Sequence, residues 1–414
     1  MIIKIIIFYA KQSYNVKASI LKVFKHTKLE KEAMSMLMTE EQKMATEGLR
    51  KILDNEIEPK LRAHGEGFIP KEMLKGFVKN LTEYGLIKAP FPEKWGGLGL
   101  DWVTHLLLWE EVGVSSIDLA LPILINVSGA DLLIRNAPEH IKEKYVPGLL
   151  SGDLFIGIGV SEPDAGSDVA AARTRAVRDG DDWIINGEKT WISNGEHMDI
   201  FICTCKTAEG ELTHILVDMN TPGIEVRGIK KMALNGQSTA QIFFGDVRVP
   251  VSNTIGELGS GLKNTLVTFE RARCHMAAWG YSIARRSMEE SIKYSQERFQ
   301  HGKLIAGHQL IADKIADMAT KIDASRLLTL RAATMIDQGI RCDKECAMAK
   351  WYSTEMAVKV CRDAVQIHGG NGVTKEYIVE RLAREAIIGT IPDGTTEIQK
   401  LLIARSLTGI QAFR

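Results

Sequence analysis

The sequence has no excess of charge of either sign, few cysteines and no zinc-protease motif. Lysine and arginine total 52 of the 414 residues, and so do aspartate and glutamate, so no net field attracts nucleic acid or an acidic membrane. The six cysteines form no CxxC pair, which favours reduced thiols in a cytoplasm over a disulfide scaffold. The ten histidines form no HExxH motif, and we predict no metal site.

The N-terminal segment lacks the length and the processing signal of a membrane anchor or a signal peptide. Its apolar run, MIIKIIIFYA, is too short to span a bilayer, and no clear small-residue cleavage site follows it. We therefore predict no stable membrane insertion. We interpret residues 1–38 as a leader that is disordered or reflects an upstream start.

Three stretches with different hydrophobic periods make up the rest of the chain. Residues 39–154 carry apolar residues at helical spacings, and residues 155–255 alternate with a period of two between Gly, Asn and Pro turns. Long helical patterns return in residues 256–414. The sequence therefore predicts an α+β multidomain fold, with a helical N-terminal domain, a middle β domain and a helical C-terminal domain.

Two polar motifs lie in the predicted β domain. GVSEPDAGSD, residues 159–168, is neither GxGxxG nor a P-loop. Its hydroxyls and N–H groups suit phosphate or the edge of a flat cofactor, and a plain polar loop explains them equally well. NGEKTWISNG, residues 186–195, reads as a hairpin followed by a strand that presents Trp191 and Ser193 on one face. The tryptophan ring packs either on a cofactor or in the core.

Five motifs in this order resemble the acyl-CoA dehydrogenase family: SEPDAGSD, GEKTWISNG, RFQHGKLIAGHQ, QIHGGNG and PDGTTEIQKLLIAR. The likeness runs from about Thr39 to the C-terminus. It implies the family fold, in which the middle domain is β-barrel-like and the C-terminal domain is a four-helix bundle. It also implies an enzyme with FAD as cofactor, an acyl-CoA substrate, an electron-transfer flavoprotein as partner, and a homo-oligomer that is a tetramer rather than a dimer.

The resemblance assigns ligand contacts residue by residue. Ser193 is expected near flavin N5, and Ser167 near both the flavin and the CoA portion. His301 and Glu397 stand where the family usually has phenylalanine and glutamine, which leaves the adenosine contacts open. The implied FAD set is Val160, Ser161, Ser167, Trp191, Ile192, Ser193, Arg298, His301, Gln309, Gln366, Gly369, Gly370, Thr395 and Glu397, of which Arg298, Gln309, Gln366, Gly369 and Gly370 are implied to act across a subunit interface. The implied substrate contacts are Ser167, Arg271 and Gly394.

Two carboxylates compete as the catalytic base. The implied reaction removes the α proton of the thioester while the β hydride moves to flavin N5. Asp393 matches the position of the usual C-terminal glutamate base, and Glu270 matches the position used by isovaleryl-CoA and long-chain members. Each also has a structural explanation, Asp393 as a turn or cap residue and Glu270 as a solvated helix charge. We predict Asp393 as the base, with its own N–H as an oxyanion donor, and keep Glu270 as the alternative.

Aspartate is one methylene shorter than glutamate, which withdraws the carboxylate by about 1.3 to 1.5 Å. A branched or alicyclic acyl group, as in cyclohexanecarboxyl-CoA, brings its α proton closer and is the predicted substrate class. The tail LTGIQAF resembles glutaryl-CoA dehydrogenases, so a dicarboxylic substrate stays open. An enoyl-CoA reductase on the same fold, and a non-catalytic flavoprotein-like binding or assembly module, are the other readings.

Overall fold

The structure is a computed structural model that describes residues 38–412. Of the predicted leader, residues 1–38, only Met38 lies within this range. The chain divides into two compact units, Met1–Gly48 and Leu49–Arg414. Apart from the first residues of helix α2, every feature described below belongs to the second unit.

Helices α5 and α6 form the centre of the N-terminal helical part. Asp101 caps α5, because its carboxylate accepts a hydrogen bond from Thr104 N at 2.6 Å. By length and composition α6 is apolar enough to cross a membrane, but 89% of its most apolar window is buried inside the protein. It packs against α5, α7, α8 and β1 and is therefore a core helix. The helices of this part are α2 (Glu40–Ile52), α3 (Glu58–His64), α4 (Lys71–Glu83), α5 (Trp102–Ser115), α6 (Ile117–Asn136) and α7 (Glu139–Ser151), with a π-helical turn at Leu53–Ile57.

A sheet occupies the middle of the chain, in the order β6-β7-β3-β2-β4-β5-β8 with β1 added beside β4. Strand β4 pairs in parallel with β1 and β2, and the other neighbours are antiparallel. Alternate side chains such as Ile185, Phe201 and Val247 fill one apolar core. The strands are β1 (Ile156–Gly159), β2 (Arg175–Asp179), β3 (Asp182–Ser193), β4 (Ile200–Ala208), β5 (Glu211–Asp218), β6 (Ile224–Gly228), β7 (Thr239–Pro250) and β8 (Thr254–Ile255).

The hairpin predicted within residues 186–195 is wrong. Strand β3 continues through Asn186 and Gly187, where its register against β7 shifts by a bulge. The Asn-Gly pair therefore bends a strand instead of ending it. The turn between β2 and β3 lies earlier, at Gly180, whose φ is 61°.

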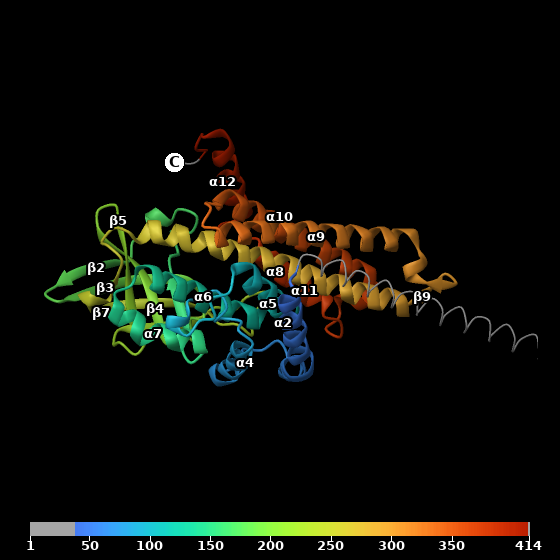
Figure 1. Cartoon of the computed structure of the whole chain (residues 1–414), viewed down its shortest axis with the longest axis horizontal. Coiled ribbons are helices and arrows are strands. Elements are labelled where there is room, and N and C mark those ends of the chain that lie inside the picture. The colour runs from blue at the N-terminus through green and yellow to red at the C-terminus, as the bar shows by residue number, and fades with distance from the viewer. Residues whose placement is uncertain (1–37, 413–414) are drawn as a thin grey trace, which may run out of the picture. The chain divides into compact units, whose positions relative to one another are not determined.

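Long helices make up the C-terminal part. Helices α8 and α10 lie side by side and run in the same direction, because Cys274 contacts Cys346 near their starts and Tyr294 stacks on His368 near their ends. Figure 1 shows β9, in the loop after α8, far from strands β2, β3 and β7 of the sheet. The elements are α8 (Gly261–Glu297), β9 (Phe299–Gln300), β10 (Lys303–Leu304), α9 (Gln309–Asp337), α10 (Asp343–His368), α11 (Val379–Gly389) and α12 (Thr396–Thr408).

Candidate active site

Asp393 lies in the turn between α11 and α12. Its φ is 55° and that of Gly394 is 93°, so two consecutive residues adopt left-handed backbone conformations. Such a conformation is uncommon for a residue with a side chain and often marks a functional position. The N-cap of α12 is Thr395, not Asp393. The capping explanation for Asp393 therefore does not hold.

Three buried polar side chains fix this turn, and sequence reasoning missed all of them. The ammonium of Lys350 donates to the carbonyl oxygen of Gly394 at 3.0 Å. Gln399 Nε2 donates to the carbonyl oxygens of Asp393 and Gly394 at 2.9 and 2.8 Å. Arg273 Nε reaches the carbonyl oxygen of Asp393 at 3.5 Å. The carbonyl oxygens of Asp393 and Gly394 are thus hydrogen-bonded. By contrast, nothing within residues 38–412 accepts a hydrogen bond from the N–H of Asp393.

The electrostatics of the turn suit a proton acceptor. Burial raises the pKa of the Asp393 carboxyl above its usual range, against the opposing effects of Lys350 and Arg273. Burial also lowers the pKa of Lys350 to about 8, although the nearby Asp393 charge works in the other direction. The Lys350 side chain is fully buried. An acid whose pKa is raised and an amine whose pKa is lowered therefore share one desolvated site.

Glu270 lies in different surroundings, on the first third of α8. Its Oε1 is 3.4 Å from Cys342 N and 3.5 Å from Cys342 Sγ, at the start of α10. The side chain is only half-buried. Arg273 is near enough to feel the charges of both Asp393 and Glu270, so the structure brings both candidate bases to one arginine.

Arg271, the predicted substrate contact, points elsewhere. Its Nη1 lies 2.5 Å from Asp131 Oδ1 in an ion pair with α6. Its guanidinium carbon also lies 5.6 Å from the ring centroid of Trp102. Of the two nearby arginines, it is Arg273 that contacts the turn of the predicted base.

The segment predicted to face the flavin gathers at a second bulge of β3. Between Lys189 and Ile192 the register against β7 shifts again, and Trp191 takes a φ of 61° there. Its indole is 63% exposed. Thr190 N donates to the carbonyl oxygen of Ser161 at 3.0 Å, so the bulge and the SEPDAGSD loop lie side by side.

A buried ion pair anchors that loop. Lys189 Nζ lies 2.6 Å from Glu162 Oε1, and both side chains are buried. Burial raises the pKa of Glu162, but Lys189 and the backbone N–H donors outweigh it and hold the pKa below its usual value. Lys189 also donates to the carbonyl oxygen of Val160 at 3.3 Å. This support for the loop was not predicted from the sequence.

These residues fit the isoalloxazine edge of a flavin. A tryptophan in a strained conformation with an exposed ring is unfavourable in water, and a flat ring system packed on it removes that exposure. Val160 and Ile192 are buried beneath the surface, and the half-buried Ser161 and Ser193 offer hydroxyls. Ser167 is exposed on the same loop, and Thr395 and Glu397 belong to the turn and the first residues of α12.

The other predicted FAD residues lie at the opposite end of α8. Arg298 follows its last residue, and about 25 residues separate it from Arg273, which at 1.5 Å per residue is about 37 Å. The ends of α8 and α10 meet there through the stacked rings of Tyr294 and His368. The residues of this distal set are Arg298, His301, Gln309, Gln366, Gly369 and Gly370, and all are exposed.

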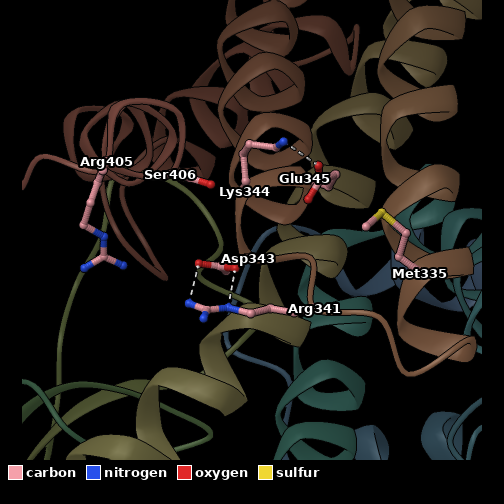
Figure 2. Close-up of a pocket in the computed structure, with 8 residues that line it drawn as sticks. Met335, Arg341, Asp343, Lys344, Glu345, Arg405 and Ser406 are labelled. Carbon is pink, nitrogen blue, oxygen red and sulfur yellow. Dashed lines mark hydrogen bonds and ion pairs between the residues drawn. The ribbon is translucent and has the colours of Figure 1, made fainter.

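A pocket of about 680 Å³ lies where α9 ends, α10 starts and α12 ends. Figure 2 shows Arg341 paired with Asp343 and Lys344 with Glu345, whereas Arg405 makes no ion pair with the other residues drawn. The pocket thus combines two neutralised cations with one that is available to an anion. It is lined by Met335, Arg341, Asp343, Lys344, Glu345, Arg405, Ser406 and Gly409.

Three family models match the chain in succession. They are the N-terminal, middle and C-terminal domains of acyl-CoA dehydrogenases, over residues 39–153, 157–247 and 259–408. The chain therefore belongs to the acyl-CoA dehydrogenase family, whose members are FAD-dependent oxidoreductases. The predicted family, fold class and cofactor are confirmed. The prediction of an enzyme is also confirmed, against the alternative of a non-catalytic module.

Relatives with different printed activities cover nearly the whole chain. A probable acyl-CoA dehydrogenase of Bacillus subtilis is 38% identical over 90% of this chain and 100% of its own length. A cyclohexane-1-carbonyl-CoA dehydrogenase of Syntrophus aciditrophicus is 34% identical over 90% and 98%. A caffeyl-CoA reductase-Etf complex subunit of Acetobacterium woodii is 36% identical over 88% and 96%.

A solved structure confirms the arrangement of the domains. The glutaryl-CoA dehydrogenase of Mycobacterium smegmatis in complex with FADH2 superimposes with a TM-score of 0.86 at 28% identity, over 92% of this chain and 97% of its own. The chain therefore has the family fold. The names of these relatives differ in the acyl group and in the direction of the reaction.

Proposed function

We propose that the protein catalyses α,β-dehydrogenation of an acyl-CoA thioester that is branched or alicyclic at its α carbon, with Asp393 as the base. The observation that carries this is the geometry of the Asp393 turn. Its carboxyl is desolvated and its carbonyl is held by Gln399 and Arg273. Its N–H has no acceptor among the described residues. A base and a free backbone donor on one residue suit enolate formation.

Asp393 takes the α proton onto a carboxylate oxygen. Because burial raises its pKa, the carboxylate is a stronger base than a solvated aspartate, while Lys350 and Arg273 favour its ionised form. As the proton leaves, negative charge develops on the thioester oxygen, and the N–H of Asp393 is the donor placed to receive it. When bound, FAD supplies the acceptor for the β hydride. Trp191 and Ser193 are proposed to orient its ring.

The pocket in Figure 2 is proposed to bind the phosphates of CoA. Arg405 offers a guanidinium without an ion pair to the other residues drawn, and Ser406 lies beside it. A phosphate can also recruit Arg341 from Asp343. Arg405→Gln is then expected to raise KM for the acyl-CoA about tenfold or more and to leave KM for the matching acyl-pantetheine unchanged. An equal loss with both thioesters would place the CoA phosphates elsewhere.

A second copy of the chain is proposed to complete each cofactor site. Arg298, in the distal part of the predicted FAD set, lies about 37 Å along α8 from Arg273, which contacts the Asp393 turn, so one chain presents the distal residues and the base at opposite ends of α8. A homotetramer in which neighbouring chains share cofactor sites brings them together. Co-expression of Asp393→Asn with Arg298→Ala is expected to give mixed oligomers with restored activity. Failure to restore any activity would indicate that each site is built from one chain.

Electrons are proposed to pass from the reduced enzyme to an electron-transfer flavoprotein, in a cytoplasm. All six cysteines are free thiols, which agrees with a reducing compartment. The alternative is reduction of an enoyl-CoA, because a relative of the chain is a caffeyl-CoA reductase-Etf complex subunit. The flavin potential with bound substrate and product separates the two directions. A dicarboxylic substrate stays open, since Arg273 lies beside Asp393 and forms no ion pair within the described part of the chain, with its Nε 3.5 Å from the Asp393 carbonyl oxygen.

Anaerobic bleaching of the flavin tests the substrate class. The panel consists of straight-chain, 2-methyl and cyclohexane-type acyl-CoA thioesters, with glutaryl-CoA as a further member. We expect kcat/KM for the α-branched and alicyclic thioesters to exceed that for straight chains of similar size at least tenfold. A preference for straight chains would overturn the assignment of the acyl group and leave the chemistry intact.

A further inference from the structure

A group of three thiols and one carboxylate lies where the third and fourth turns of α8 pack against the start of α10. Glu270 and Cys274 are four residues apart on α8, and Cys342 and Cys346 are four apart at the start of α10. Each pair therefore lies on one face of its helix, and the two faces meet. Facing side chains on packed helices are the usual origin of metal sites in helical bundles.

The spacing of the donor atoms matches a small coordination shell. Cys342 Sγ is 3.6 Å from Cys346 Sγ and 3.5 Å from Glu270 Oε1. Cys346 Sγ is also 3.6 Å from Cys274 Sγ. Around tetrahedral Zn²⁺, with bonds of about 2.3 Å to sulfur and 2.0–2.2 Å to oxygen, ligand atoms lie about 3.5 to 3.8 Å apart. The separation of Cys342 and Cys346 in the chain, C-x₃-C, also falls within the range of zinc sites.

The site holds three donors in one small volume. The ligand atoms of Glu270, Cys342 and Cys346 all lie within 4.8 Å of one another, and Cys274 contacts this group through Cys346 alone, at 3.6 Å between the sulfurs. The three thiols are buried, with at most 1% exposure. Glu270 is half-buried and forms the side nearest solvent. Arg273 supplies a buried positive charge near Cys346 and Glu270, which offsets part of the charge of an anionic ligand set.

We propose that Glu270, Cys342 and Cys346 form a binding site for a thiophilic divalent cation, with Zn²⁺ as the representative ion and with Cys274 as the neighbour of Cys346. This proposal departs from the prediction of no metal site made from the sequence, which did not consider the C-x₃-C spacing. Binding exchanges the S–H protons of Cys342 and Cys346 for metal–sulfur bonds, so up to two protons are released to solvent per ion bound. The carboxylate oxygen of Glu270 supplies the third ligand. No change of oxidation state is involved.

The chemistry of the neutral thiols agrees with such an exchange. The hydrogen bond to Cys346 and burial raise the pKa of Cys342 above its usual range. For Cys346 the hydrogen bond to Cys274 has the largest effect in the same direction. Cys342 and Cys346 bond to one another through their sulfurs. A bound cation places positive charge directly at these sulfurs and thereby favours loss of their protons.

The test measures metal binding to the FAD-loaded protein. Its cysteines are first reduced, and the reductant and any bound metal are then removed. We expect one Zn²⁺ per chain by elemental analysis. Bound Co²⁺ is expected to produce thiolate-to-metal charge-transfer bands. It is also expected to produce tetrahedral d–d bands, which lie on the red side of the flavin absorption. Cys342→Ser and Cys346→Ser should each weaken Zn²⁺ binding by at least the 10–100-fold seen for loss of an outer-shell partner. Glu270→Gln should weaken it while preserving the cobalt–thiolate bands.

Cys361→Ser is the matched control. Cys361 lies on the same helix, is fully buried, and bonds to Ser287 outside the cluster, so this variant should bind Zn²⁺ like the wild type. Equal binding by Cys342→Ser, Cys346→Ser and the wild type would overturn the proposal. So would wild-type protein that takes up no Zn²⁺ or shows no thiolate bands with Co²⁺, a result that does not depend on how the variants fold. A protein that is isolated with a Cys342–Cys346 disulfide, and that takes up no metal after this disulfide is reduced, would also count against the proposal.

Discussion

The two acids near Arg273 occupy contrasting surroundings. Asp393 stands on a left-handed turn whose carbonyls are held by Gln399 and Arg273, and burial raises its pKa. Glu270 stands on a regular helix, half-buried, with its carboxylate directed at Cys342. A carboxylate becomes a base for a weak carbon acid when its desolvation and position are fixed together. Both side chains are half-buried, but it is at Asp393 that Gln399 and Arg273 bond to the residue's own carbonyl and fix its position, which favours Asp393 as the base.

Replacing each acid by its amide is the strongest way to break this comparison. We expect Asp393→Asn to lower the rate of flavin bleaching by a saturating acyl-CoA about 10²- to 10⁴-fold, because the base is lost while the backbone N–H remains. Glu270→Gln should change it less than about threefold. Stopped-flow spectroscopy at the flavin band measures both. If Glu270→Gln lost most of its bleaching rate while Asp393→Asn stayed active, Glu270 would be the base and Asp393 would not.

Lengthening the base sharpens the proposed link between Asp393 and the acyl group. Asp393→Glu restores the methylene and moves the carboxylate outward by about 1.3 to 1.5 Å. We expect the preference for alicyclic over straight-chain thioesters to fall at least tenfold, since one methylene in a fitted pocket is worth about 10- to 200-fold. The ratio of kcat/KM across the panel is the measurement. An unchanged ratio would show that the length of the base does not select the substrate.

Much of this site can be predicted from the sequence, for physical reasons that differ by residue. The change of hydrophobic period from helical to alternating and back predicts the α, β, α order, and the motif around Asp393 marks the base candidate. Lys350, Gln399 and Arg273 stay hidden, because they act on backbone carbonyls that a sequence pattern does not locate. The Asn186-Gly187 pair predicts a hairpin, as such pairs usually do, but here both residues lie within a bulged strand.

The shape of the turn itself can be tested at Gly394. A Cβ there would lie 2.6 Å from Gln399 Nε2, and a φ of 93° is strained for any residue with a side chain. Gly394→Ala is expected to lower kcat/KM about tenfold by displacing the carbonyl that Gln399 and Lys350 hold. Gly339→Ala is the control, because its φ is 67° but its Cβ would meet no atom within 4 Å. Equal activity of the two variants would show that the contact with Gln399 is unimportant.

The smallest expected effect is a shift of the pH profile caused by Lys350. Lys350 and Arg273 lower the pKa of Asp393, against the larger effect of burial. Removing the lysine charge therefore raises that pKa further. Because Asp393 accepts a proton only when ionised, activity rises with pH through its pKa. The acid limb of kcat/KM for Lys350→Met should accordingly move to higher pH, with a smaller change on the alkaline plateau.

Lys359→Met serves as the control for this shift, since Lys359 lies on the same helix but pairs with Asp317 and Asp363 at its exposed side. Its acid limb should coincide with that of the wild type. Loss of the Lys350 bonds to the carbonyls of Gly394 and Thr390 also costs stability, so the profiles are compared at a temperature at which both variants are folded. If the acid limb of Lys350→Met moved to lower pH, the titrating group would not be an acid that faces the Lys350 ammonium. The pH profile of Glu270→Gln would then be measured in the same way.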